Sequence, residues 1–126
     1  MSKMLLSINP EYVESIIQGK KKYEFRKVRC KEGVTHIIFY ETAPIKKVVA
    51  EAQIEEIIEG PVDEIWEQAK ECAGVSLDFY KAYYGGKDKA VAYKLNNVIM
   101  YSQPKELSEY GLSSPPQSFV YIEDYS

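Results

Sequence analysis

A change of hydrophobic period at Gly19 constrains this fold more than any other feature of the sequence. Before it, Val13, Ile16 and Ile17 recur at the spacing of a helix that buries one face. After it, aromatic and charged residues alternate over residues 21–26, which is typical of a strand with one polar face. Glycine tolerates the left-handed backbone that ends a helix. We therefore predict a helix that passes directly into a polar strand at Gly19.

The start of this helix is also marked. Residues 4–8 form a short apolar run that predicts a strand, and Asn9 follows as an expected N-cap. Pro10 suits the first helical position, and Glu11 complements the positive end of the helix dipole. The chain therefore begins with a strand, then a helix, then the polar strand.

The middle of the chain predicts further strands. A turn at residues 31–33 precedes the β-branched and aromatic residues 34–40, which we interpret as the returning strand of a hairpin with residues 21–26. Residues 41–44 form a loop, and residues 47–58 alternate as a half-exposed strand.

Two helices and two or three strands complete the pattern. Helices are predicted from Pro61 to Gly74 and, capped by Ser76, up to Tyr84. Strands are expected at residues 91–95, 98–101 and 119–122, the second of which continues the first or pairs with it.

This order predicts a single α+β domain over residues 1–126, because the strands are joined largely by hairpins and the helices are segregated between them, which differs from the alternation of a parallel sheet. We expect a small, mixed and partly open β-barrel of five to six strands with about three flanking helices. A length of 126 residues suits one core, and 45% hydrophobic with 28% charged residues excludes a disordered chain.

Charge is unevenly distributed along the chain. The net charge is −3, but residues 19–31 contain five lysines and two arginines against one glutamate, a local charge of +6, so the other residues carry −9. Much of the acidic charge lies between Glu51 and Glu71. Such asymmetry indicates a face that binds polyanions. The alternative is a solvated basic strand balanced by an acidic helix.

The expected cellular compartment and the expected lack of cofactors are inferred from features that the sequence does not contain. No apolar run suits a signal peptide or a membrane span, and Cys30 and Cys72 have no metal-ligand spacing, so we expect a cytoplasmic protein with two free thiols. His36 is the one histidine, and no zinc site is expected. The sequence has no phosphate-binding loop, dinucleotide glycine motif or serine elbow, so no cofactor is expected.

The motif that carries chemistry is Gly19-x-Lys21-x-x-Glu24-x-Arg26. Glu24 and Arg26 lie two apart in a strand and share a face, and Lys21 at the start of the strand can lean toward them. A carboxylate between two cations stays ionised and orients both, as in a preorganised pocket. The alternative is an exposed ladder of ion pairs, which stabilises a fold little.

This motif, with its preceding helix, resembles that of the ASCH domain in the PUA-like superfamily. The segment LLSINPEYVESIIQGKKKYEFRKVRCKEGVTHIIFYETAPIKKVVA carries the similarity, and SLDFYKAYYGGKDKAVAYKL and PPQSFVYI extend it. The resemblance implies a β-barrel with flanking helices and a cleft, lined by the motif, that accepts RNA or a nucleotide-like ligand.

The resemblance also implies a set of ligand-binding residues. Lys21, Glu24 and Arg26 would line the cleft beside Gly19, Thr42 would form a wall, and Ser118 would lie nearby. Phosphates are expected on the adjacent basic residues Lys20, Lys22, Lys27 and Arg29.

Three functions are compatible with these residues. The first is a module that binds single-stranded RNA or a modified base. The second is a hydrolase, with Lys21 and Glu24 catalytic, that acts on RNA or on a modified nucleoside such as N4-acetylcytidine; superfamily members that deacetylate this nucleoside use a threonine where this chain has Glu24. The third is an adaptor in transcription or translation regulation that contacts a basic protein through the acidic helix.

Aromatic residues add one more expectation. The chain has eleven tyrosines, of which Tyr83, Tyr84 and Tyr93 are candidates for stacking on bases. The alternative places most of the tyrosines in the core or at its rim, with hydroxyls that reach water.

Overall fold

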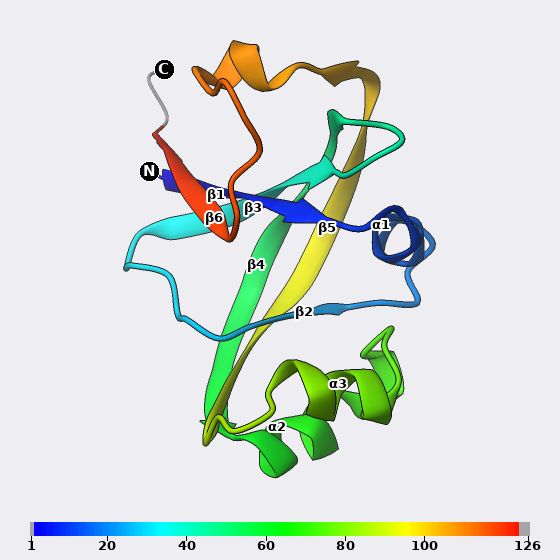
Figure 1. Cartoon of the computed structure of the whole chain (residues 1–126), viewed down its shortest axis with the longest axis vertical. Helices are drawn as coiled ribbons and strands as arrows, with labels where there is room; N and C mark the ends of the chain where they lie inside the picture. The colour runs from blue at the N-terminus through cyan, green and yellow to red at the C-terminus, as the bar shows by residue number, and fades with distance from the viewer. Residues whose placement is uncertain (1, 124–126) are drawn as a thin grey trace.

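One curved six-stranded sheet forms the frame of the protein (Figure 1). The structure, a computed structural model, describes residues 2–123. The strands lie in the order β2-β5-β4-β3-β1-β6. Their bounds are β1 Ser2–Ile8, β2 Tyr23–Arg26, β3 Val34–Glu41, β4 Lys47–Pro61, β5 Lys89–Lys105 and β6 Phe119–Glu123.

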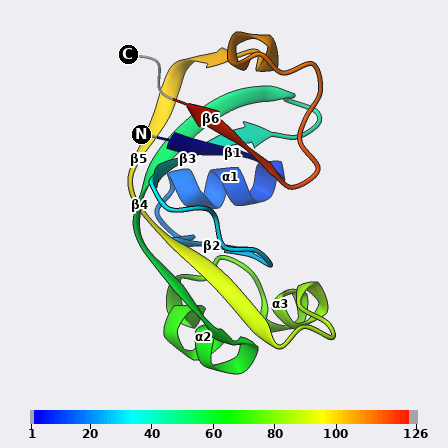
Figure 2. The ribbon, with the colours of Figure 1, turned by 90° about the vertical axis from the view of Figure 1, so that its left-hand side faces the viewer.

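Three α-helices accompany the sheet: α1 Pro10–Ile17, α2 Val62–Ala69 and α3 Leu77–Tyr83. Two short 3-10 helices cover Lys70–Cys72 and Leu107–Tyr110. Figure 2 shows the long strands β4 and β5 spanning the molecule, with α1 beside one part of the sheet and α2 and α3 at the other end. The predicted α+β class, with its barrel-like curved sheet, is confirmed, although β2 and β6 remain edges of an open sheet.

The predicted hairpin between residues 21–26 and 34–40 is wrong. β2 pairs antiparallel with β5, so that Glu24 lies opposite Tyr93. β3 instead lies between β1, to which it is parallel, and β4, to which it is antiparallel. The side chains explain this difference, because the apolar β3 can be buried between two strands, whereas the charged β2 suits an edge.

Of the two alternatives for residues 98–101, continuation of the strand at residues 91–95 is confirmed, because both lie in β5, in which Asn97 adopts a positive φ of 48°. One helix boundary differs from the prediction. The helix expected from Pro61 to Gly74 ends at Ala69 and continues as a short 3-10 turn. The predicted cap at Ser76 is present, and its hydroxyl accepts a hydrogen bond from the Phe79 amide at 3.1 Å.

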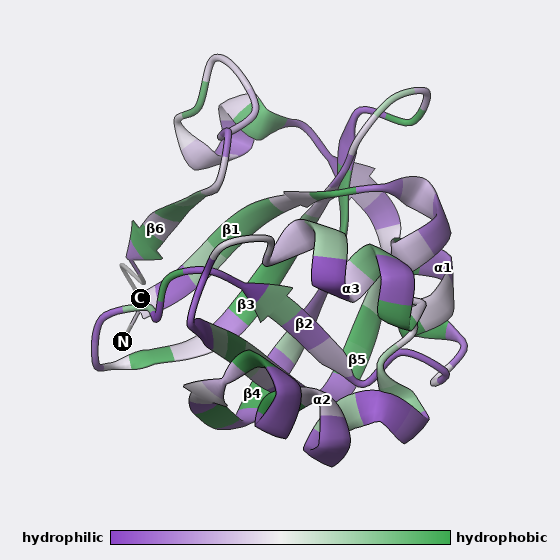
Figure 3. Cartoon of the chain, turned by 60° about the horizontal axis from the view of Figure 1, so that its bottom comes forward, coloured by the Kyte–Doolittle hydropathy of each residue, from purple (hydrophilic) through white to green (hydrophobic). Residues whose placement is uncertain are grey.

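The buried apolar residues form three clusters. One joins β1, α1, β3 and the middle of β5, and includes Leu6, Ile16 and Phe39. The second joins α2, α3 and the start of β5 around Tyr80, and Phe25 of β2 belongs to it. The third joins residues of β1, β3 and β4. Figure 3 shows the apolar residues concentrated along β1 and β3, whereas α2 carries many hydrophilic residues.

Within residues 2–123, no helix has both the length and the apolar character needed to cross a membrane.

Candidate functional site

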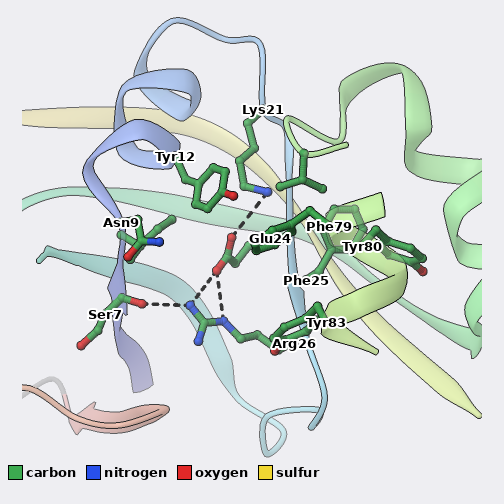
Figure 4. Close-up of a pocket in the computed structure, with 12 residues that line it drawn as sticks. Ser7, Asn9, Tyr12, Lys21, Glu24, Phe25, Arg26, Phe79, Tyr80 and Tyr83 are labelled. Carbon is green, nitrogen blue, oxygen red and sulfur yellow. Dashed lines mark hydrogen bonds and ion pairs between the residues drawn. The ribbon is translucent and has the colours of Figure 1, made fainter. Parts of the chain in front are cut away.

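A pocket with a volume of about 150 Å³ lies between α1, β2 and α3 (Figure 4). The end of β1 closes one side, and the loop before α3 closes another. The lining residues are Ser7, Ile8, Asn9, Tyr12, Lys21, Glu24, Phe25, Arg26, Val75, Phe79, Tyr80 and Tyr83. Three motif side chains, Lys21, Glu24 and Arg26, therefore share one concave site that belongs to no single apolar cluster.

Glu24 is the central acceptor of the site. Its Oε2 accepts hydrogen bonds from Arg26 Nε at 3.0 Å and from Arg26 Nη2 at 2.6 Å. Arg26 Nη2 also donates to the Ser7 carbonyl at 3.1 Å, which ties β2 to β1. Glu24 is only 6% exposed, so the alternative of an exposed ion-pair ladder does not describe it. Within residues 2–123, Nη1 of Arg26 has no hydrogen-bond partner.

Lys21 is held by backbone as well as by charge. Its Nζ donates to the Ala73 carbonyl at 2.9 Å and lies 3.7 Å from Glu24 Oε1. The rings of Tyr12 and Phe25 flank the ammonium, with centroids 5.6 and 5.0 Å away. The residue is 3% exposed, whereas Lys20 and Lys22 beside it are exposed. From the alternation along the strand we expect Lys21 on the same side as Tyr23 and Phe25, with its side chain leaning toward Glu24. The structure confirms the second point, because the Lys21 ammonium lies next to the Glu24 carboxylate.

Burial lowers the pKa of Lys21 below its usual 10.5, although the nearby Glu24 carboxylate opposes this shift. Between the lowered pKa and 10.5, the unfolded chain binds a proton that the folded chain does not. The free energy of unfolding should therefore rise with pH in this window. We expect Lys21→Met to flatten that rise, as measured by urea denaturation at a series of alkaline pH values. Equal slopes for the two proteins would contradict this assignment.

Aromatic rings form the walls of the pocket. The rings of Tyr12 and Phe79 lie 5.6 Å apart at 57°, and Phe79 is 46% exposed. Tyr83 lies on the same helix as Phe79, one turn further along, and also lines the pocket. Burial raises the pKa of both Tyr12 and Tyr83, so their hydroxyls remain protonated donors at neutral pH. The pocket thus combines π faces with a buried carboxylate and two cations.

The predicted basic face does not form one surface. Lys27 lies at the rim of the pocket, with its Nζ 4.7 Å from the centroid of the Tyr83 ring. Arg29 pairs with Glu59 at 3.5 Å, with both side chains exposed. Lys22 instead lines a second hollow between the end of α1 and β5. Lys20, two residues before Lys22, is also exposed.

The other predicted site residues lie outside the pocket lining. Gly19 has a φ of 80° and ends the turn after α1. Thr42 contacts the rim residue Asn9, with its hydroxyl 3.5 Å from Asn9 Oδ1. Ser118 is exposed and does not line the pocket. Asn9 occupies the predicted N-cap position, but its side chain makes no capping hydrogen bond.

Two of the three candidate stacking tyrosines are buried in the core. Tyr84 is 1% exposed, and its hydroxyl donates to the carbonyls of Arg26 and Val91. Tyr93 is 0% exposed, and its hydroxyl donates to the Val28 carbonyl. The prediction that these tyrosines stack on bases is therefore wrong for both residues. Only Tyr83 of the three lines the pocket.

Several pocket residues were not predicted as site residues. Tyr12 lies within the helix predicted after Asn9, and Phe79 lies within the helix predicted after Ser76, but neither position indicated a pocket. The one sequence signal for Phe79 is its position three residues after the helix cap Ser76. This position fixes where Phe79 lies on the helix, but it does not say which part of the protein the side chain faces. Gly74 was predicted as a helix terminator. In the structure its Cα faces Lys21 so closely that an added Cβ would lie 2.4 Å from the Lys21 Cβ.

In the part of the chain that the structure describes, the cysteine, histidine and acidic side chains form no metal site or disulfide. Within residues 2–123, no group of three or more His, Cys, Asp or Glu side chains is arranged to hold a metal ion. Cys30 is buried, Cys72 is half-buried, and neither forms a disulfide. His36 Nδ1 lies 2.7 Å from the Thr35 hydroxyl.

Comparisons with known proteins identify the family and support the overall fold. Residues 6–105 match the ASCH domain family. A curated ASCH domain-containing ribonuclease of Zymomonas mobilis is 32% identical over 124 residues, which cover 94% of this chain and 82% of that protein. The crystal structure of ASCH from Zymomonas mobilis superposes with a TM-score of 0.86 at 29% identity, covering 96% of this chain and 87% of that one.

A second kind of relative is longer. The large ribosomal subunit protein uL22 of Ureaplasma parvum serovar 3 is 32% identical over 121 residues, which cover 95% of this chain. This chain spans only 39% of the length of that relative. The family match extends over most of the chain, includes the whole motif, and agrees with the close structural similarity. This chain belongs to the ASCH domain family.

Proposed function

We propose that this protein binds single-stranded RNA and takes one base, ordinary or modified, into the pocket between α1, β2 and α3. The observation that carries the proposal is the combination of aromatic walls with the Glu24–Arg26 pair at the floor. Every base has a π face that stacks on an aromatic ring, and its polar edge needs fixed donors and acceptors. The pocket provides both.

The size of the pocket supports a single base. Its volume of about 150 Å³ is below the roughly 300–1,000 Å³ of sites that enclose drug-sized ligands. Lys27 at the rim would meet a backbone phosphate, because phosphates lie outside a pocket that holds the base. Arg29 pairs with Glu59 and Lys22 lines a different hollow, so the proposal takes Lys27 as the phosphate contact beside the pocket. The Zymomonas relative, by its name, acts on RNA, which favours RNA over other polyanions.

The first test is the aromatic wall. We expect Phe79→Ala to weaken binding of a fluorescent single-stranded RNA about tenfold, since stacking contributes roughly 1–3 kcal/mol per base. Phe79 is 46% exposed, so its removal leaves the core intact. Phe79→Trp keeps a stacking surface and should bind nearly as well as the wild type. Met100→Ala, at an exposed residue of β5, serves as the control. Unchanged anisotropy titrations for Phe79→Ala would contradict the proposal.

The second test is the phosphate contact of Lys27. Removing one phosphate contact to a single strand should reduce the slope of log affinity against log salt by about 0.7. We expect this change for Lys27→Ala, measured in titrations over a series of KCl concentrations. Lys87→Ala removes an exposed lysine that lines a different hollow and should leave the slope unchanged. Equal slopes for all three proteins would exclude Lys27 as a phosphate contact.

RNA hydrolysis is a second candidate function. The specific observation is that Glu24, which lines the pocket, uses Oε2 for Arg26, while its Oε1 lies 3.7 Å from Lys21 Nζ. Oε1 is thus the atom that can accept a proton from a ribose hydroxyl or from water, with the neighbouring cations stabilising the negative charge that develops on the phosphate.

This candidate is tested with end-labelled RNA resolved on a gel. We expect cleavage by the wild type that Glu24→Gln loses, since the amide cannot accept the proton. An RNA with 2′-deoxy sugars distinguishes attack by the ribose hydroxyl from attack by water. Binding without any cleavage above the Glu24→Gln control would leave RNA binding as the function and exclude hydrolysis.

A further inference from the structure

The amine of Lys21 has features of a nucleophile that neither RNA binding nor hydrolysis requires. Its Nζ lies in the pocket, but its contacts are a single backbone carbonyl at 2.9 Å and a carboxylate oxygen at 3.7 Å. An ammonium has three N–H donors. If the amine loses one proton, it can keep the bond to Ala73 and still direct its lone pair into the pocket.

The surroundings favour this neutral form. Only 2% of the Lys21 side chain is exposed, and the rings of Tyr12 and Phe25 face its nitrogen. Withdrawal from water penalises the charged amine, and Arg26 nearby adds a second positive charge. Buried lysines of this kind serve as Schiff-base residues. Glu24 is the opposing group, because its carboxylate favours the charged form.

We propose that Lys21 condenses with an aldehyde admitted to the pocket, and that the ligand class is an aldehyde bearing a phosphate. Arg26 lines the same pocket and supplies the positive charge that attracts the phosphate. This inference stands on the geometry of Lys21 and does not require the proposed RNA function.

The step balances without a co-reactant. The lone pair of the neutral amine attacks the carbonyl carbon, and Glu24 carries the first of the two amine protons from the nitrogen to the carbonyl oxygen to give a carbinolamine. Glu24 accepts a proton from the nitrogen and returns it to the hydroxyl group, which leaves as water. The product is an imine between Nζ and the former carbonyl carbon, so nothing is oxidised or reduced.

The experiment uses glyceraldehyde 3-phosphate as the small probe, with sodium cyanoborohydride to reduce the imine to a stable amine. Peptide mass spectrometry then locates the label among the fourteen lysines of the chain. We expect the label to concentrate on Lys21 and to be lost in Lys21→Arg, while Lys87→Ala, at an exposed lysine that lines a different hollow, is labelled at Lys21 like the wild type. Label spread over the exposed lysines, with Lys21 unmodified, would overturn the proposal even if Lys21→Arg fails to fold.

A second arm distinguishes a small phosphorylated aldehyde from one carried by nucleic acid. An RNA with one abasic site exposes a sugar aldehyde between two phosphates, and borohydride trapping would give a covalent protein–RNA complex on a denaturing gel. Trapping at Lys21 with either probe, or with both, supports the nucleophilic amine. The probe that is trapped shows whether the aldehyde is a small molecule or is carried by nucleic acid. Binding of unmodified RNA is measured separately, so its loss would refute the RNA proposal without affecting this one.

Discussion

Glu24→Ala is expected to lower the free energy of unfolding by about 3–5 kcal/mol, the usual cost of removing one partner from a buried ion pair. The substitution leaves Lys21 and Arg26 without their shared carboxylate, and these side chains are only 2% and 16% exposed. Lys21 can relieve part of this penalty by losing its proton, whereas Arg26 cannot. Urea denaturation followed by circular dichroism measures the change.

The matched control for this variant is Glu59→Ala. Glu59 also pairs with an arginine, Arg29, but their side chains are 37% and 51% exposed. Removing an exposed pair typically changes stability by no more than about 1 kcal/mol. Glu24→Gln keeps an acceptor for Arg26 and should fall between the two. If Glu24→Ala destabilises the protein no more than Glu59→Ala, the buried network does not stabilise the fold as argued here.

Gly74→Ala is expected to cost about 3 kcal/mol of stability, through backbone strain and overpacking together, and to disrupt the pocket. Gly74 has a φ of 71°, and an added Cβ would lie 2.4, 2.5 and 2.9 Å from the Lys21 Cβ, Cγ and Cδ. These atoms are the root of the side chain and not its flexible end. The Lys22 amide donates to the Cys72 carbonyl at 2.8 Å, which prevents the backbone from moving away. The Lys21 side chain must therefore lose either its hydrogen bond to the Ala73 carbonyl or its ion pair with Glu24.

Gly19→Ala is the control that separates the effect of backbone strain from the effect of the steric clash with Lys21. Gly19 has a similar φ of 80°, but no heavy atom lies within 4 Å of an added Cβ. Its alanine variant should show only the strain of a left-handed residue, about 1–2 kcal/mol. RNA affinity and cyanoborohydride labelling of Lys21 should decline in Gly74→Ala and persist in Gly19→Ala. Equal losses in the two variants would show that Gly74 does not position Lys21.

The local elements of this fold were predictable because local sequence determines them. Pro10 at the first helical position, Ser76 as a cap and Gly19 at a positive φ each act within a few residues along the chain. The pairing of β2 was not predictable in this way. Its partner β5 lies more than sixty residues away, and the choice between β3 and β5 depends on which strand can be buried on both sides.

The candidate site follows the same division. The spacing of Glu24 and Arg26 indicated a shared face, and the position of Lys21 at the start of the strand predicted that it leans toward them. The distribution of Lys20, Lys22, Lys27 and Arg29 between different surfaces was not predictable, because alternation along a strand says which side a residue faces but not what lies there. Tyr84 and Tyr93 looked like Tyr83 in sequence, yet the packing of α3 and β5 buries both.

By itself the sequence determined the helix-to-strand transition at Gly19, the placement of the motif on that strand and the family to which the chain is similar. All three depend on periodicity, backbone preference or residues adjacent in the chain. Only the tertiary structure decided that α3 supplies Phe79 and Tyr83 as walls and that the Ala73 carbonyl and Gly74 hold Lys21. The physical reason is distance along the chain. More than fifty residues separate Lys21 from these groups, and only the packing of α1, β2 and α3 around the pocket brings them together.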